Sequence, residues 1–141
     1  MIINDEVRNL LKVNAKKAFD LGEIPVSAVI VDSNMNVICS AFNNRQSTSN
    51  ILGHAEVLCI LEAERLIGDW RLNGYSMIVN LEPCVMCSAI ISESRLDNVC
   101  FMLEKPNLEH YFDIRSEYVE GYDEDKLYFR NLLTDFFEDM R

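Results

Sequence analysis

Most of what this sequence predicts depends on the segment "VNLEPCVMCSAIISESR", residues 79–95. An apolar β-type run is interrupted by Glu82-Pro83, and an apolar helical segment containing Cys84 and Cys87 follows. A CxxC pair directly after a proline, at the start of a helix, admits three interpretations. It can be a redox pair, half of a structural metal site, or part of a catalytic metal site.

Helical and strand patterns alternate along the rest of the chain. Apolar residues at helical spacing follow Asn4, a suitable N-cap, and end before Gly22, which suits the left-handed position after a helix. The patterns predict further helices at 54–68, 84–94 and 123–141, and strands at 25–32, 36–43, 75–81, 96–103 and within 114–121. Strands interleaved with helices predict an α/β fold, a three-layer α/β/α sandwich with a central mixed sheet of about five strands.

Two stretches between these elements, 45–53 and 104–113, are polar and irregular. In the helix expected at 123–141, apolar residues recur at helical spacing and are expected to face the core. These residues are Tyr128, Leu132, Leu133, Phe136 and Phe137.

The composition predicts a single domain over residues 1–141. Apolar residues make up 49% of the 141 residues and charged residues 26%, and a chain of this length can bury one sizeable core. No apolar run is long enough to span a bilayer, and acids stand at the N-terminus where a signal peptide carries lysines. We therefore expect no membrane partner and a cytoplasmic protein, whose five cysteines are thiols or metal ligands rather than disulfides.

The net charge of −10 is unevenly distributed. Residues 1–53 carry five basic and five acidic side chains, whereas residues 109–141 carry four basic and ten acidic ones. Tight binding of nucleic acid without regard to sequence depends on neutralising phosphates, so this distribution argues against it while allowing a local basic patch. A solvated acidic helix face accounts for the C-terminal charge.

The redox and structural-zinc interpretations of Cys84 and Cys87 lack supporting residues. A redox pair belongs to a thioredoxin-like unit and has no metal ligand nearby. A structural zinc site needs four ligands, and the sequence has no second CxxC. The remaining cysteines stand in apolar stretches typical of small buried side chains: Cys39, Cys59 and Cys100. Structural zinc remains the main rival to a catalytic site.

The two histidines have different surroundings. His110 stands in a charged, irregular segment, whereas His54 opens a predicted helix and has Glu56 two residues later. His-x-Glu followed by Pro-Cys-x-x-Cys is the pattern of zinc deaminases. His54, Cys84 and Cys87 would hold one zinc ion per chain and leave the fourth tetrahedral position to water. Zinc lowers the pKa of such a water toward ~7, and Glu56 would transfer its proton as the catalytic acid and base.

Longer segments extend this pattern from about Val7 to Arg141. The segments "GEIPVSAVIV", "HAEVLCILEA", "RLNGYSMIVNLEPCVMCSAIISESRLDNVCF" and "LLTDFFEDMR" resemble bacterial tRNA-specific adenosine deaminases, of the cytidine-deaminase-like superfamily. The "LEPCxMC…SR" run and the closing "FF…R" favour this branch over free cytosine or guanine deaminases. The resemblance implies a cytidine-deaminase-like fold, a zinc cofactor, a homodimer, and conversion of adenosine to inosine at the wobble position of a tRNA anticodon stem-loop.

The resemblance also implies two substrate-binding residues and shows three departures. By position, Asn43 matches the asparagine that hydrogen-bonds the purine, and the Ala55 backbone amide lies beside the site. "NILG" precedes the histidine where the family usually has Asp-Pro-Thr-Ala. The segment after Phe101 is shorter than in the family and lacks its Lys-x-Gly-Ala element, and the C-terminus is more acidic. All three departures fall where contacts with tRNA are expected.

Two alternatives to a tRNA adenosine deaminase remain open. A deaminase of a free base or nucleoside, such as cytosine, guanine or adenosine, would share the fold and suit the acidic surface. A non-catalytic RNA-binding partner subunit would hold zinc but would have no use for the Glu56 carboxylate. Products separate the three: inosine in an anticodon stem-loop, ammonia from a free base, or neither.

Overall fold

The computed structural model describes residues 2–105 and 116–139 and is built around a five-stranded mixed sheet. The strands are β1 (Ser27–Val31), β2 (Val37–Phe42), β3 (Ser76–Leu81), β4 (Asn98–Leu103) and β5 (Ser116–Tyr118). They lie in the order β2-β1-β3-β4-β5, with β1 antiparallel to β2 and β3, and with β3, β4 and β5 parallel. The predicted mixed sheet is therefore confirmed.

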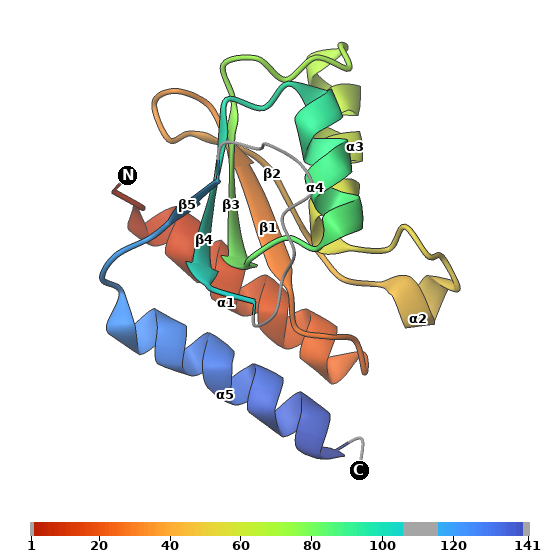
Figure 1. Cartoon of the computed structure of the whole chain (residues 1–141), viewed down its shortest axis with the longest axis vertical. Helices are drawn as coiled ribbons and strands as arrows, with labels where there is room; N and C mark the ends of the chain where they lie inside the picture. Colours follow the sequence, from red (N-terminus) through yellow and green to blue (C-terminus); the bar gives the residue numbers. More distant parts are fainter. Residues whose placement is uncertain (1, 106–115, 140–141) are drawn as a thin grey trace.

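Helices cover both faces of this sheet (Figure 1). They are α1 (Asp5–Asp20), α2 (Arg45–Thr48), α3 (Ala55–Ile67), α4 (Val85–Ser94) and α5 (Asp123–Asp139). Helices α3 and α4 pack on one face, and α1 and α5 pack on the other. Because successive side chains of a strand point to opposite faces, β1 serves both cores: Ala28 and Ile30 join the α3–α4 side, and Val29 and Val31 join the α1–α5 side. The three-layer α/β/α sandwich is confirmed.

The ends of α1 follow the sequence pattern. The Val7 N–H donates to Oδ1 of Asn4 over 3.0 Å, so Asn4 is the N-cap as predicted. Gly22 has φ +76°, the left-handed conformation that glycine adopts without strain after a helix. Among the described residues, no helix is long and apolar enough to cross a membrane.

The inward face of α5 was predicted only in part. Leu132 is buried, but Tyr128 and Phe137 are exposed, so the prediction was wrong for these two aromatic residues. The buried face also includes Phe129 and the charged Asp125, whose carboxylate meets cations of α1. Because these ion pairs and Phe129 orient the helix, its inward side differs from the apolar stripe expected.

The two irregular stretches have different outcomes. The stretch at 45–53 contains the short helix α2, which was not expected. Most of the stretch at 104–113, including His110, lies outside the described residues. Cys39, Cys59 and Cys100 are buried, as predicted.

Asp125 joins α5 to α1 through two ion pairs. Its Oδ2 accepts a hydrogen bond from Nε of Arg8 over 2.7 Å, and its Oδ1 accepts one from Nζ of Lys12 over 3.0 Å. Burial raises the pKa of Asp125, but the hydrogen bonds and charges of Arg8 and Lys12 outweigh this effect and leave the pKa below its ordinary value. A carboxyl group whose pKa falls on folding stabilises the fold at neutral pH, and this stabilisation is lost as the pH falls through the folded pKa.

We expect Asp125→Asn to lower the free energy of unfolding by about 2 kcal/mol at neutral pH, because two charge-assisted hydrogen bonds are weakened. The difference from the wild-type chain should shrink as the pH is lowered from about 5 toward 2, where the carboxylate itself becomes protonated. Urea unfolding at several pH values measures both effects. Asp123→Asn, at an exposed position of the same helix, is the control. Equal stabilities of Asp125→Asn and the wild type at neutral pH would contradict the argument.

Candidate metal centre

The predicted metal ligands stand at the N-terminal ends of two helices. His54 is the N-cap residue of α3, and Cys84 is the N-cap residue of α4. Neither side chain forms the hydrogen bond to its own helix that a capping side chain would form. Cys87 follows in the first turn of α4. All three side chains are therefore available for an interaction between the helices.

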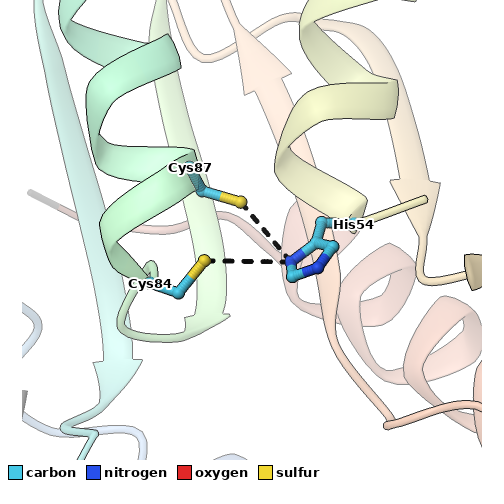
Figure 2. Close-up of side chains that lie close together, drawn as sticks. All are labelled: His54, Cys84 and Cys87. Atoms are coloured by element: carbon cyan, nitrogen blue, oxygen red, sulfur yellow. Dashed lines mark hydrogen bonds between the residues drawn. The ribbon is translucent and has the colours of Figure 1, made fainter. Parts of the chain in front are cut away.

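These three side chains converge on one point (Figure 2). Nδ1 of His54 lies 3.6 Å from Sγ of Cys87 and 3.9 Å from Sγ of Cys84. One ligand atom from each residue lies within 4.8 Å of the other two. The imidazole presents Nδ1 to both sulfurs, so Nδ1 rather than Nε2 is the nitrogen available to a metal (Figure 2).

The donor set and its spacing fit zinc. In tetrahedral zinc sites Zn–S is about 2.3 Å and Zn–N about 2.0 Å, which places nitrogen and sulfur ligands about 3.6 Å apart. The observed nitrogen–sulfur distances of 3.6 and 3.9 Å lie close to this value. One imidazole and two thiols are soft-to-borderline ligands that zinc prefers, and three protein ligands leave one position open.

The thiols of Cys84 and Cys87 differ in pKa. A hydrogen bond from Cys87 lowers the pKa of the Cys84 thiol to about 5, and the nearby charges of His54 and Lys105 act in the same direction. The same hydrogen bond and burial raise the pKa of Cys87. Cys84 is thus the readier thiolate, and a metal that binds both sulfurs displaces the proton held by Cys87.

Glu56 lies in the first turn of α3 and is 4% exposed. Burial raises the pKa of its carboxyl group to about 7. Its Oε1 is buried and has no hydrogen-bond partner among the described residues. A buried polar atom without a partner is rare in proteins and implies a role toward a group from outside the chain. An activated water beside the metal ligands would supply that partner.

Asn43 and Ala55, predicted as separate substrate-binding residues, contact each other. The Ala55 N–H donates to Oδ1 of Asn43 over 2.7 Å. This bond satisfies an N–H group at the start of α3 and fixes the orientation of the Asn43 amide. Among the described residues, Nδ2 of Asn43 has no acceptor, so it is the donor that Asn43 can offer to another molecule.

The loop before His54 is tightly packed at Gly53. The Asn44 N–H donates to the Gly53 carbonyl over 2.9 Å. A Cβ atom at Gly53 would lie 2.6 Å from Oδ1 of Asn44 and 2.7 Å from Cα of Arg45, so only glycine fits there. The departure "NILG" from the family pattern therefore accompanies a close approach of two backbone segments beside a metal ligand.

A small cavity of about 70 Å³ opens beside His54 and Cys84, two of the three candidate ligands. The predicted residues His54, Glu56, Cys84 and Asn43 line it. Sequence reasoning missed further residues of the lining: Ile24, Val26, Leu81, Glu82 and Lys105. The position of Glu82 directly before Pro83 and Cys84 was a usable signal, but nothing local pointed to Lys105.

Fold and site together place the chain among proteins with a deaminase-type zinc-binding region. Residues 3–103, which include all three candidate ligands, match the family "Cytidine and deoxycytidylate deaminase zinc-binding region". Over 138 residues the chain is 37% identical to the tRNA-specific adenosine deaminase of Bacillus subtilis, covering 90% of this chain and 84% of that protein. The chain belongs to the cytidine and deoxycytidylate deaminase family and, within it, to the branch of tRNA-specific adenosine deaminases.

Other relatives support the same branch. The tRNA-specific adenosine deaminase of Aquifex aeolicus is 33% identical, over 90% of this chain and 89% of that protein. The Rickettsia felis enzyme of the same name is 48% identical over 85 residues, 60% of this chain, and that match spans only 59% of the relative.

Solved structures agree with this placement. A structure from a study of A-to-I editing by tRNA:A34 deaminases matches with a TM-score of 0.80 and 25% identity over 92% of this chain and all of the other. A guanine deaminase from Nitrosomonas europaea matches with a TM-score of 0.76 over 95% of this chain and 87% of the other, at 12% identity, which shows the fold alone.

We expect the purified chain to hold about one zinc ion, and Cys87→Ser to lose most of it, because a serine hydroxyl is a poor substitute for a thiolate ligand. Elemental analysis after dialysis against a weak chelator measures the content. Cys100→Ser is the matched control, since Cys100 is equally buried but belongs to the α1–α5 core. Full zinc content in Cys87→Ser would remove Cys87 from the site.

Proposed function

We propose that this chain catalyses the hydrolytic deamination of adenosine to inosine at the wobble position of a tRNA anticodon. The supporting observation is the buried Glu56 carboxylate. Its Oε1 has no hydrogen-bond partner in the part of the chain that the structure describes, and it lies beside the converging metal ligands. The substrate follows from the relatives, which are tRNA-specific adenosine deaminases. A tRNA substrate also agrees with the cytoplasmic location expected from the sequence.

The zinc ion would be held by Nδ1 of His54 and by the Sγ atoms of Cys84 and Cys87. When bound there, zinc lowers the pKa of a water molecule, so that at neutral pH this water can lose a proton and attack C6 of a purine. The N-terminal ends of α3 and α4 favour this arrangement, because their positive partial charge stabilises thiolate ligands.

Glu56 transfers the protons of the reaction. Oε1 takes one proton from the attacking water and passes it to the ring nitrogen. The same carboxylate then takes the second proton from the oxygen now bonded to C6 and passes it to the amino group, which leaves as ammonia when the C6–N bond breaks. Adenosine and water thus become inosine and ammonia. A pKa raised to about 7 by burial suits a group that must both accept and release a proton.

Asn43 orients the base. Because its Oδ1 accepts from the Ala55 N–H, its Nδ2 can donate to a purine ring nitrogen. The Ala55 amide contributes by holding Asn43 in place. A base must leave its stack to reach such a recessed site, and the splayed bases of an anticodon loop satisfy this requirement.

We expect Glu56→Gln to keep its zinc and its fold while inosine formation falls by about 10²–10⁴, the usual contribution of a general acid and base. The assay is inosine formation in an anticodon stem-loop with adenosine at the wobble position. Glu64→Gln, further along the same helix, is the control and should react at the wild-type rate. A Glu56→Gln variant with wild-type activity would reduce Glu56 to a structural acid.

The same assay tests the rival substrates. Ammonia release from free cytosine, guanine and adenosine should be negligible beside inosine formation in the stem-loop. If a zinc-loaded preparation makes no inosine but deaminates a free base, the free base is the substrate and tRNA is not. If it does neither, the chain is a non-catalytic subunit.

A homodimer is the proposed assembly. Apolar side chains remain exposed on the α3–α4 side of the molecule, including Leu61 at 55%, Leu66 at 51% and Val85 at 37% exposure. Burying them against a second copy would remove apolar surface from water. Light scattering at micromolar concentration should give twice the chain mass, and a monomer mass would contradict the proposal.

A further inference from the structure

One cation lines the small cavity beside the metal ligands. Among the described residues of its lining, Lys105 is the only lysine or arginine. The ammonium group is close enough to oppose the rise in the pKa of Glu56 that burial causes, and to add to the lowering of the pKa of Cys84 by Cys87. Lys105 belongs to the segment after Phe101 in which this chain departs from its family.

The backbone of Lys105 is fixed against the start of α4. The Glu82 N–H donates to the carbonyl of Leu103 over 2.8 Å, and the Lys105 N–H donates to Oε1 of Glu82 over 3.1 Å. These bonds join the end of β4 to the Glu82-Pro83 turn that leads into Cys84. The exposed Lys105 side chain therefore starts from a defined position at the rim of the site.

A second, larger hollow of about 710 Å³ adjoins the cavity, since Ile24 and Asn43 line both. Its lining includes Arg45, the first residue of α2. The buried Glu23 holds α2 in place by accepting the Gln46 N–H over 3.0 Å and the Ser47 N–H over 2.7 Å. Arg45 thus also projects from an anchored backbone.

Neither Arg45 nor Lys105 forms an ion pair within the described part of the chain. No carboxylate of the described residues pairs with Arg45 or Lys105, whereas other cations such as Arg8, Lys12 and Arg65 form ion pairs. In a chain of net charge −10, two cations without a carboxylate partner among the described residues, both beside the same site, contrast with the overall acidity. A nucleotide inside an RNA loop brings two phosphates with it, one on each side of its ribose.

We propose that Lys105 and Arg45 bind the two backbone phosphates that flank the deaminated adenosine. The inference rests on the proposed function and extends it, because it makes these two residues selective for a nucleotide within a strand over a free base. Lys105 acts as a mobile point charge, and Arg45 offers a planar set of donors suited to phosphate oxygens.

The test is binding of an anticodon stem-loop to zinc-loaded protein, followed by fluorescence anisotropy over a range of salt concentrations. Lys105→Gln and Arg45→Gln should each weaken binding about tenfold at low salt, through loss of a charge-assisted contact. Each should also reduce the slope of log Kd against log salt by about 0.7, the value for one phosphate of a single strand. In turnover, KM should rise in both variants while zinc content stays at the wild-type value, and Arg45→Gln should keep the wild-type kcat.

Chemically altered RNA sharpens the assignment. Replacing one flanking phosphate by an uncharged methylphosphonate should weaken binding to the wild-type chain but not further weaken binding to the variant that has lost the matching cation. The other methylphosphonate should show the same relation to the other variant. Arg65→Gln is the control, because Arg65 lies about 16 Å along α3 from His54 and should change nothing.

Unchanged affinity and salt slope in both variants would overturn the inference, as would a wild-type chain that does not bind the stem-loop at low salt. The inference would also be overturned if the losses of affinity from a cation variant and from the matching methylphosphonate were additive. Additive losses would mean that the cation and that phosphate do not contact each other. The proposed function is judged separately: inosine formation by a wild-type chain whose cation variants bind RNA normally would leave the reaction standing and remove only the two phosphate contacts.

Discussion

The meeting of two helix N-termini at one point is the constraint on which the rest of this structure depends. His54 and the two cysteines are separated by 30 and 33 residues, yet their ligand atoms lie within 4.8 Å of one another. This requires α3 and α4 to start side by side on the same face of the sheet (Figure 1). The sheet supplies that arrangement, because β3 lies between β1 and β4 and delivers its carboxyl end directly to Cys84.

The same constraint concentrates charge in a small volume. The Cys84 thiol and the Glu56 carboxyl group line one cavity, and burial is the main cause that raises the pKa of Glu56 to about 7. Two features offset the cost of placing these ionisable groups close together. They are the positive ends of α3 and α4, and the hydrogen bond through which Cys87 stabilises a Cys84 thiolate. The α1–α5 layer carries none of these groups, and its own ion pairs around Asp125 serve to join two helices.

Local sequence signals predicted the order of the elements and the ligand set. Period-two apolar patterns indicated the strands, Asn4 and Gly22 marked the ends of α1, and His-x-Glu with PCxxC identified the residues that the fold brings together. The failures involve contacts distant in sequence. The orientation of α5 depends on Asp125 meeting Arg8 and Lys12 more than 110 residues away, and no periodicity within the helix encodes that partner. The Asn43–Ala55 bond and the approach of Gly53 to Arg45 likewise appear only in three dimensions.

The acidity of the chain and its relation to RNA are compatible for a physical reason. Repulsion between phosphates and surface acids is screened beyond roughly 8–10 Å at physiological salt, so acids that lie outside the cavity and the hollow would weaken RNA binding less than their number suggests. Asp139, at the end of α5, lines the hollow itself. Two cations beside the site would act on phosphates at contact distance, where screening is weakest. Affinity would then come from few contacts close to the reacting base rather than from a broad basic surface, and non-specific attachment to other RNA would stay low. Under the proposed function, such a chain would gain selectivity from the geometry of a single splayed nucleotide, which is the same geometry that a recessed metal centre would require.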